Sequence, residues 1–297
     1  MRAVSSVKLF GKKIRVRKFS CSEDGGPCDP DSPAVKIYAK VTNACNARCR
    51  FCSNGPPSER IDFDADKLLD IVRTIEQSRL RLQRVCLTGG EPSCAEEAVR
   101  RFLKGMEDDD LCDVPVFLST NGISPAARRL MRHPRLNCVT MSLHHYDYGR
   151  LGEIYGIGGP VAPFEDMGVE SRKFTATCNL MRGYVDSAGE AKKMMDFALE
   201  IGCSELGFVS LLDKNAFCRE AFVGIDDLHL ETLDHVIFVT RHERPSVCRC
   251  ANYLYASGDR TLSVYLRDVT DGGNCESSLL FDGKYLRQGF ESDSIIC

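Results

Sequence analysis

The chain has 297 residues, of which 43% are hydrophobic and 27% charged, as in an ordinary globular protein. Its formal net charge of −3 excludes the broad basic surface of a nucleic-acid-binding protein, and no apolar run approaches the roughly 20 residues that cross a bilayer. The start at Met1 has no signal-peptide core, so we expect a cytoplasmic protein with no membrane partner. Cysteine is unusually frequent, at 16 residues, and clustered thiols in a reducing compartment indicate metal ligation rather than disulfides.

The first 33 residues are predicted to be an extension outside the main domain. Residues 6–10 and 13–17 flank Gly11 and predict a small hairpin. Residues 21–33 are rich in Gly, Pro, Asp and Ser and predict a loop. We therefore place the first boundary after residue 33.

Residues 34–210 alternate between strand and helix patterns. Strands are predicted at 35–41, 85–87, 115–118, 138–143, 174–178 and 205–210. Helices are predicted at 64–80, 96–106, 125–132 and 188–201. This alternation is typical of an α/β domain with a parallel sheet, and such domains place their chemistry at the C-terminal ends of the strands.

From about residue 211 the alternation stops. Residues 226–238 have a helical pattern, and two strands at 253–255 and 262–266 flank a hairpin turn at 257–259. We therefore expect a small C-terminal subdomain at residues 211–297.

Three thiols follow the first strand of the α/β region at C-x3-C-x2-C spacing: Cys45, Cys49 and Cys52. A four-iron cluster takes four ligands, so three thiols leave one iron open for a further ligand. A zinc site with a distant fourth ligand, or three unrelated thiols, would also account for the spacing.

A glycine-rich segment follows the next predicted strand, and it contains Gly89, Gly90 and Glu91. Glycines allow a backbone to approach a ligand closely. The cysteine loop and this segment, in this order, resemble the radical S-adenosylmethionine (radical SAM) superfamily. The resemblance implies a partial (β/α)6 barrel, and a [4Fe–4S] cluster whose open iron binds the amino and carboxylate groups of SAM.

The resemblance also implies SAM contacts at later strand ends, beyond Gly89, Gly90 and Glu91. The positions that match are Asn121, Ser142, Met181 and Arg182. His144 and His145 are adjacent and face opposite sides of a strand, so one of them, taken as His144, is expected to face the barrel mouth and the substrate.

The C-terminal region holds a second set of cysteines. Cys218, Cys248, Cys275 and Cys297 are the preferred ligands of a second [4Fe–4S] cluster, although several buried thiols without metal would fit the same pattern. Cys250 remains over, and because Cys248 and Cys250 share a strand face, either could be the spare thiol. A spare thiol near a substrate radical can return a hydrogen atom, and we assign this role to Cys250 with Cys248 as the alternative.

With this tail the chain resembles the radical SAM epimerases of aminoglycoside biosynthesis that convert neomycin C to neomycin B. The resemblance implies inversion of a sugar carbon, a cationic sugar substrate, and an electron donor such as flavodoxin or ferredoxin. Acidic substrate contacts would come from Glu153, Asp213, Glu220 and Asp271. A radical SAM dehydrogenase of a sugar alcohol is the main alternative, and a non-catalytic iron–sulfur protein is a second one. A peptide-modifying enzyme fits less well, because the extension before residue 34 is too short for a peptide-binding domain.

Overall fold

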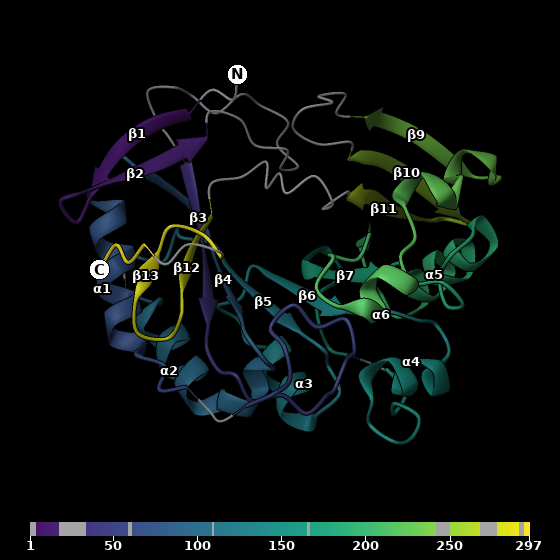
Figure 1. The fold of residues 1–297 in the computed structure, drawn as a ribbon, viewed down its shortest axis with the longest axis horizontal. Coiled ribbons are helices and arrows are strands. Elements are labelled where there is room, and N and C mark those ends of the chain that lie inside the picture. Colours follow the sequence, from purple (N-terminus) through teal and green to yellow (C-terminus); the bar gives the residue numbers. More distant parts are fainter. Residues whose placement is uncertain are drawn as a thin grey trace.

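The computed structural model describes residues 4–17, 34–58, 61–108, 110–164, 167–241, 250–267, 278–290 and 294–297 (Figure 1). The predicted N-terminal hairpin is confirmed, with strand β1 (Val4–Leu9) antiparallel to β2 (Lys12–Arg17). Phe10 and Gly11 both have positive φ, as a two-residue hairpin turn of this hand requires. The loop predicted at 21–33, which contains Cys21 and Cys28, lies outside the described residues.

The predicted parallel α/β fold is confirmed. Strands β3 to β8 pair in parallel and in chain order, so each helix returns the chain to start the next strand alongside. The strands are β3 (Ala34–Lys40), β4 (Arg81–Thr88), β5 (Val116–Thr120), β6 (Cys138–Ser142), β7 (Phe174–Asn179) and β8 (Glu205–Val209). The helices are α1 (Ala65–Glu76), α2 (Glu96–Gly105), α3 (Pro125–Met131), α4 (Tyr148–Tyr155), α5 (Ala188–Glu200) and α6 (Ala216–Glu220).

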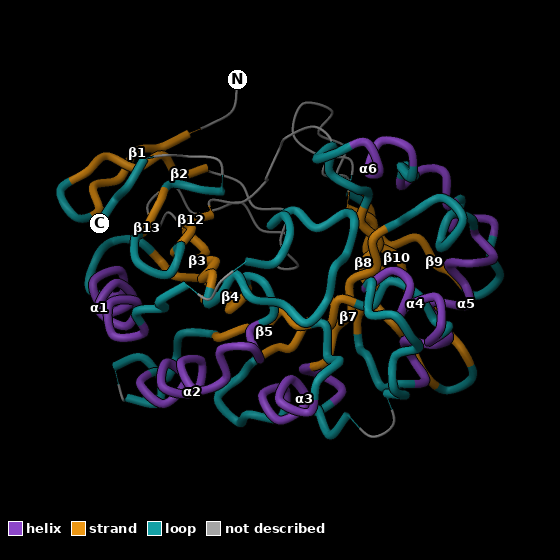
Figure 2. The backbone as a smooth tube through the Cα atoms, turned by 60° about the horizontal axis from the view of Figure 1, so that its bottom comes forward, coloured by secondary structure: helices purple, strands orange, loops and turns teal. Residues whose placement is uncertain are grey.

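Helices α1, α2, α3 and α5 lie on the outside of the curved sheet (Figures 1 and 2). Helix α1 shows why: its apolar residues recur at helical spacing and are buried, while Asp64 caps its first turn by accepting a hydrogen bond from the Lys67 backbone N–H at 2.9 Å. Among the helices of the described residues, none has the length and apolar character needed to cross a membrane.

The strands after residue 211 continue the sheet of the barrel at both of its edges. They are β9 (Val236–Arg241), β10 (Ala251–Ser257), β11 (Arg260–Arg267), β12 (Ser278–Phe281) and β13 (Leu286–Arg287). The 11-stranded sheet has the order β13-β12-β3-β4-β5-β6-β7-β8-β11-β10-β9. The C-terminal subdomain expected at 211–297 therefore shares its sheet with the barrel, and its strands flank the barrel on both sides.

The predicted hairpin between β10 and β11 is confirmed, but the predicted helix at 226–238 is wrong. That segment forms two short 3-10 turns, Ile225–Leu228 and Leu230–Thr232, and then strand β9. The run Val-Ile-Phe-Val-Thr in β9 consists of β-branched and aromatic residues, which favour an extended chain over a helix.

Candidate active site at the C-terminal ends of the strands

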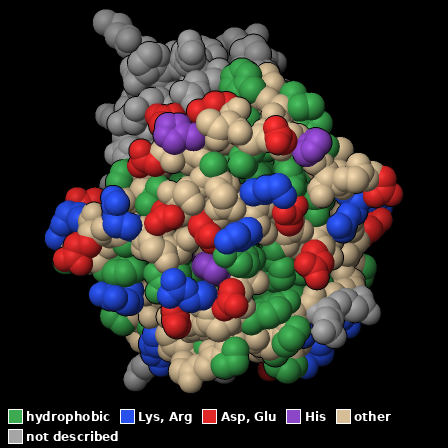
Figure 3. Space-filling model, turned by 90° about the vertical axis from the view of Figure 1, so that its right-hand side faces the viewer, with side chains coloured by type: hydrophobic (Ala, Val, Ile, Leu, Met, Phe, Trp, Pro, Cys, Tyr) green, Lys and Arg blue, Asp and Glu red, His purple; other side chains and the backbone are tan. Residues whose placement is uncertain are grey.

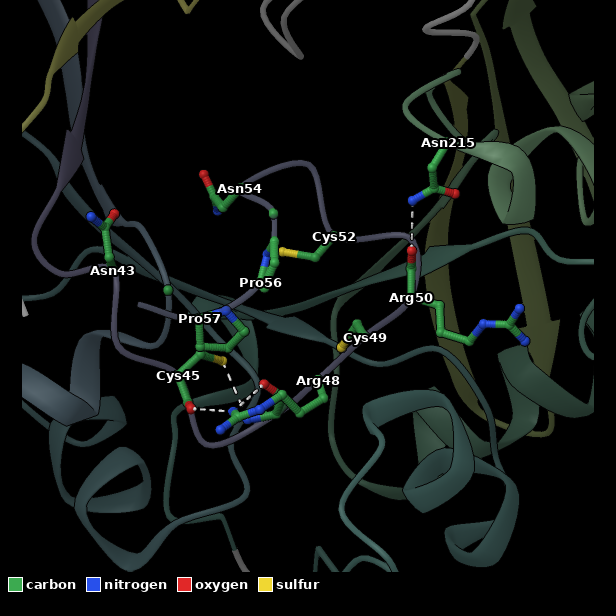
Figure 4. A pocket seen from close by; sticks show the side chains of 13 residues that line it. Asn43, Cys45, Arg48, Cys49, Arg50, Cys52, Asn54, Pro56, Pro57 and Asn215 are labelled. Atoms are coloured by element: carbon green, nitrogen blue, oxygen red, sulfur yellow. Dashed lines mark hydrogen bonds between the residues drawn. The ribbon is translucent and has the colours of Figure 1, made fainter. Parts of the chain in front are cut away.

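The cysteine loop leaves β3 at the C-terminal edge of the parallel strands, as predicted for catalytic loops of this fold. Cys45, Cys49 and Cys52 line one pocket of about 310 Å³, and their sulfur atoms lie around the same hollow (Figure 4). Arg48 closes one wall of the loop, where its guanidinium donates to the carbonyls of Cys45 and Ala47 at 3.1 Å each. The three thiols are thus gathered by a loop that is held together by its own hydrogen bonds.

Gly89 and Gly90 lie directly against the cysteine loop. A Cβ on Gly90 would come within 2.1 Å of the Ala44 carbonyl oxygen, and one on Gly89 within 2.5 Å of the Thr42 carbonyl oxygen. The backbone N–H of Gly90 donates to the Thr42 carbonyl at 2.7 Å. The glycines therefore allow the end of β4 to pack against this loop, and Gly90 also lines the pocket of the thiols.

Glu91 is buried, with 1% of its surface exposed, and its carboxylate is satisfied by the protein. It accepts hydrogen bonds from the Ser93 N–H at 3.0 Å, the Thr120 hydroxyl at 2.7 Å and the Asn121 N–H at 2.8 Å. Burial raises the pKa of Glu91, although these hydrogen bonds oppose the rise. Glu91, which we predicted to contact SAM, thus connects the end of β4 to the end of β5 next to the cysteine loop.

Asn121 and Ser142 also take part in this support. The Asn121 side-chain amide donates to the side-chain oxygen of Asn46 at 2.7 Å, inside the cysteine loop. The Tyr155 hydroxyl donates to the Ser142 carbonyl, and the Tyr155 carbonyl accepts from the Arg48 N–H at 2.6 Å. The ends of β5 and β6 and the last turn of α4 are therefore all connected to the loop that carries the thiols.

His144 packs against the cysteine loop, and its ring meets the Phe51 ring edge-on at 4.9 Å between centroids. Its Nδ1 accepts a hydrogen bond from the Asn179 N–H at 3.1 Å, so Nε2 carries the proton of the neutral ring. Complete burial lowers the pKa of His144 to about 3. At neutral pH His144 is therefore an uncharged donor at the inner side of the strand ends, and His145 lies on the other side.

Comparison with known proteins agrees with this geometry. Residues 39–165, which include the cysteine loop, Gly90, Glu91 and His144, match the family model described as the radical SAM superfamily. These findings support a radical SAM enzyme. A [4Fe–4S] cluster and SAM are the cofactors that this family implies.

Two relatives show how far the similarity extends. A GTP 3',8-cyclase of Aquifex aeolicus (strain VF5) is 30% identical over 123 residues, which are 38% of this chain and 36% of the relative. A probable GTP 3',8-cyclase of Thermococcus kodakarensis is 27% identical over 227 residues, which are 71% of this chain and 69% of the relative. The chain therefore spans little more than a third of the Aquifex relative.

Two solved structures share the fold. SuiB of Streptococcus suis, bound to S-adenosylmethionine, superposes with a TM-score of 0.52 at 15% identity, over 71% of this chain and 46% of that one. A radical SAM methyltransferase from Sphaerobacter thermophilus superposes with a TM-score of 0.51 at 19% identity, over 75% of this chain and 71% of that one. At these identities the likeness concerns the fold alone.

The residues of the cysteine loop fit a four-iron cluster better than a single ion. In the part of the chain that the structure describes, no three His, Cys, Asp or Glu side chains are close enough to hold one metal ion. In a four-iron cluster each thiolate binds a different iron, so the sulfurs stand farther apart than around zinc. Burial and the nearby thiolates of Cys52 and Cys45 raise the pKa of Cys49 to about 12, and metal ligation relieves this cost by neutralising the thiolates.

Helix α6 contacts the cysteine loop from the C-terminal part of the chain, which the sequence patterns did not indicate. The Asn215 side-chain amide donates to the Arg50 carbonyl at 2.9 Å (Figure 4). The Arg50 guanidinium lies 4.2 Å from the centroid of the Phe217 ring. Cys218 lies in a small apolar cluster with Met181 and Phe51. The only available signal in the sequence was Asn215 as a helix N-cap.

The two preferred auxiliary-cluster thiols that the structure describes, Cys218 and Cys297, lie apart. Cys218 is buried in α6 beside the cysteine loop, whereas Cys297 lies next to β13, whose Leu286 donates its N–H to the Cys297 carbonyl at 2.9 Å. The C-terminus and α6 lie on opposite sides of the molecule in both Figure 1 and Figure 2. Cys248 and Cys275 lie outside the described residues.

Cys250 is half-buried and directly precedes β10. Ala251 pairs with Leu266, and the next residue of β11, Arg267, pairs in parallel with Val209 at the end of β8. The register therefore places Cys250 at the edge of the sheet where the parallel strands end, which is also the edge of the cysteine loop.

The remaining predicted contacts are on the surface or in apolar surroundings. Glu153 pairs with Arg150 at 3.2 Å, and Asp213 pairs with Arg219 at 2.8 Å, all with exposed side chains. Arg182 donates to the Phe222 carbonyl at 3.3 Å from an exposed position, and Met181 is buried. Glu220 is exposed at the end of α6, and Asp271 lies outside the described residues.

Ser210 follows β8 at this same edge and was not among the predicted site residues. It is 2% exposed, and its hydroxyl has no hydrogen-bond partner among the described residues. A buried hydroxyl without a partner costs about 1–3 kcal/mol, which makes Ser210 a position to test by mutation. No sequence pattern distinguishes Ser210 from the other residues of its strand.

Proposed function

We propose that this protein is a radical SAM epimerase that inverts a carbon centre of a cationic aminoglycoside sugar, as in the conversion of neomycin C to neomycin B. The observation that carries the proposal is the position of Cys250. A thiol stands at the edge of the sheet that holds the cysteine loop, several strands away across the barrel mouth. Epimerisation needs such an arrangement, because hydrogen must leave one face of the carbon and return to the other.

The chain's own residues provide for the start of the reaction. Cys45, Cys49 and Cys52 would hold the [4Fe–4S] cluster, which together with SAM supplies a 5'-deoxyadenosyl radical when both are bound. Gly90 and Glu91 fix the loop in place, because Gly90 packs against the Ala44 carbonyl and the Glu91 N–H donates to it at 2.8 Å. The rings of His144 and Phe51 fill the space beside the loop and exclude water from it.

The hydrogen balance then assigns the second half of the reaction to Cys250. The bound cofactors would supply the radical that takes a hydrogen atom from one face of the sugar carbon, and the Cys250 S–H bond would break to return one from the opposite side. The resulting thiyl radical takes one electron and one proton to become a thiol again. Each turnover thus consumes one SAM, two electrons and one proton, and the electrons come from a donor such as flavodoxin or ferredoxin.

A second [4Fe–4S] cluster near Cys250 remains part of the proposal, as a relay for the second electron. Because Cys218 and Cys297 lie on opposite sides of the molecule, at most one of them joins Cys248 and Cys275 in its ligand set. Iron analysis of the reconstituted protein tests this: about eight irons per chain are expected, and about four would rule out the second cluster.

The relatives suggest GTP 3',8-cyclase activity as a second candidate, since one of them covers 71% of this chain. GTP carries a strongly negative triphosphate, which proteins bind with free Lys and Arg groups. In the pocket of the thiols, Arg48 is bound to loop carbonyls and Arg50 is stacked on Phe217. The chain also has a net charge of −3, so an aminoglycoside fits it better than GTP.

The decisive experiment compares the reduced, cluster-loaded protein with its Cys250→Ala variant in deuterated water, with SAM and neomycin C. The wild type is expected to form neomycin B carrying one deuterium, because the thiol hydrogen exchanges with solvent. Cys250→Ala is expected to cleave SAM and form 5'-deoxyadenosine without any inverted product. Cys86→Ala, which changes a cysteine on β4, serves as the matched control.

Each alternative gives a different result in this experiment. A dehydrogenase would release a ketone and no deuterated epimer, and a cyclase would consume GTP but not neomycin C. Normal inversion by Cys250→Ala and also by Cys248→Ala would rule out hydrogen return from a thiol.

A further inference from the structure

A second pocket, of about 420 Å³, lies on the other side of the β6 end from the cysteine loop. The loop from β6 to α4 and the loop from β7 to α5 form its walls, with His145 and Tyr146 from the first and Tyr184 and Glu190 from the second. His144 and His145 are consecutive, so one ring faces the cysteine loop and the next faces this pocket. The pocket is therefore separate from the site of the radical chemistry.

The walls of this pocket are connected to each other by hydrogen bonds. The Arg150 guanidinium donates to the Gly183 carbonyl at 2.9 Å, and it lies 4.8 Å from the centroid of the Tyr184 ring. The Tyr146 hydroxyl donates to Glu190 at 2.7 Å. A pocket whose walls are already fixed loses little conformational entropy when a ligand binds.

His145 presents a polar atom to this pocket. It is 4% exposed, and its Nδ1 accepts a hydrogen bond from the Asp147 N–H at 2.9 Å. Burial lowers the pKa of His145, so the ring is neutral at pH 7 and Nε2 carries its proton. Within the described residues Nε2 has no hydrogen-bond partner, which leaves a neutral N–H donor for a hydroxyl or ether oxygen.

Carboxylates outnumber cations around the pocket. Asp147, Asp186 and Glu190 line it, and Arg150 is the cation among the lining residues. A second cation, Lys193, pairs with Glu190 at 2.8 Å from outside the lining, so three carboxylates face two cations. Arg150 also pairs with Glu153 at 3.2 Å, outside the pocket. Asp186 uses Oδ2 to accept the Gly183 N–H at 2.7 Å, so its other oxygen can still accept a hydrogen bond. Figure 3 shows that acidic and basic side chains are mixed over this side of the molecule, so the negative excess is local.

We infer that this pocket binds a protonated amino sugar, with its ammonium group between Asp186 and Glu190 and a hydroxyl group on His145. Carboxylates beside aromatic rings are suited to an ammonium group, and the buried imidazole N–H is suited to a sugar oxygen. The pocket would bind this class of ligand whether or not the protein is an epimerase. If it is one, a ring of the substrate distant from the reacting carbon occupies the pocket.

The test is a calorimetric titration of the cluster-loaded protein with glucosamine and with glucose, which has a hydroxyl group where glucosamine has its ammonium group. Glucosamine is expected to bind at least about 10-fold more tightly at low salt, and added salt is expected to weaken only glucosamine. Equal binding of the two sugars, or no binding of glucosamine, would overturn the inference.

Substitutions of the two carboxylates test whether the sugar binds between them. Glu190→Gln and Asp186→Asn are each expected to weaken glucosamine binding about 3- to 5-fold and to leave glucose unaffected. Glu170→Gln is the matched control, because Glu170 pairs with Lys173 in the same i,i+3 geometry in which Glu190 pairs with Lys193, away from the pocket. The inference is wrong if Glu190→Gln and Asp186→Asn bind glucosamine as Glu170→Gln does. Should Glu190→Gln lower the melting temperature, Asp186→Asn decides.

This result is independent of the epimerase test. The titration measures binding without reductant and without turnover, whereas the Cys250→Ala experiment measures inversion. Glucosamine binding without epimerisation would therefore support the amino-sugar pocket and contradict the epimerase proposal. Epimerisation with no effect of Glu190→Gln would support the epimerase proposal and contradict the amino-sugar pocket.

Discussion

The C-terminal edge of the sheet consists of two regions that differ in how far the protein satisfies its own polar groups. At the ends of β3, β4 and β5, the Glu91 carboxylate and the Asn121 amide have protein partners, and Gly90 packs against the cysteine loop. At the end of β8, the buried hydroxyl of Ser210 has no partner within the described residues. The first region thus satisfies its own polar groups, while the second holds a buried hydroxyl without a partner among the described residues.

This difference follows from what each region has to do. The cysteine loop must hold three thiols at fixed positions before any substrate arrives, so its supports are internal and rigid. In the proposed reaction, the region around β8, β11 and β10 accepts the substrate and places a thiol on its far side, and groups that await a ligand cannot also be satisfied by the protein. Mutations in the first region should therefore alter stability and cluster content, and those in the second should alter binding.

The largest effect is expected from Gly90→Ala. The added Cβ would lie 2.1 Å from the Ala44 carbonyl oxygen, which is backbone and can yield only if the cysteine loop moves. We expect a loss of about 3 kcal/mol in the free energy of unfolding and a lower iron content per chain. Chemical denaturation and iron analysis measure the two effects.

Gly189→Ala is the matched control for this change. Gly189 lies in the first turn of α5 with no atom within 4 Å of an added Cβ, so alanine should be neutral or stabilise by up to about 1 kcal/mol. If Gly90→Ala kept the stability and the iron content of Gly189→Ala, the close packing of β4 on the cysteine loop would not matter.

The sequence predicts the region at the ends of β3, β4 and β5 better than the region at the end of β8. The three cysteines and Gly90 follow strands whose apolar residues are regularly spaced, so both the order of the strands and the edge they share could be predicted. Helix α4 could not be predicted from the sequence, because Gly149 and Gly152 weaken its helical pattern. Contacts that join distant segments, such as Asn215 with Arg50, depend on the relative placement of strands, which local spacing does not contain.

The tail shows the same limit. The pairing of β11 with β8 and of β12 with β3 puts Cys218 and Cys297 far apart, although both are thiols of the same region of the sequence. Spacing between cysteines indicates metal binding only where a short loop also fixes the geometry. Cys45, Cys49 and Cys52 meet that condition.

An intermediate effect is expected from His144, which packs on Phe51 of the cysteine loop and accepts a hydrogen bond from Asn179 at the end of β7. Burial lowers its pKa from 6.5 to about 3, whereas in the unfolded chain the ring titrates normally. A folded pKa that is depressed gives stability that is present above pH 6.5 and is lost as pH falls toward 3. Between pH 8 and pH 5 this loss amounts to about 2 kcal/mol. His144→Gln should remove this part of the pH dependence of unfolding.

His229→Gln provides the control for replacing a histidine by glutamine, since His229 has an exposed side chain. Denaturation curves of the three proteins at pH 5, 6.5 and 8 measure the difference. A pH dependence of His144→Gln that matched the wild type would show that the ring is not buried as a neutral group.

The smallest effect on stability, and the sharpest contrast between the two regions, is expected from the two serines that flank β8. Ser204 precedes the strand at the opposite edge of the sheet, and its hydroxyl donates to the Phe174 carbonyl at 3.2 Å. Ser204→Ala should therefore cost about 1 kcal/mol. Ser210→Ala removes a buried hydroxyl that has no partner among the described residues, so the free energy of unfolding should stay equal or rise by up to about 1 kcal/mol.

Ligand binding should rank these two serines in the opposite order. If a bound molecule completes the hydroxyl of Ser210, Ser210→Ala should weaken binding of SAM or the sugar by about 5-fold or more, while Ser204→Ala binds normally. A Ser210→Ala protein that is less stable than Ser204→Ala would mean that the hydroxyl already has a partner in the protein. The polar groups at the end of β8 would then be hydrogen-bonded by the protein, as those that support the cysteine loop are. The thiol of Cys250, before β10, would then have to act in a site without an unsatisfied polar group.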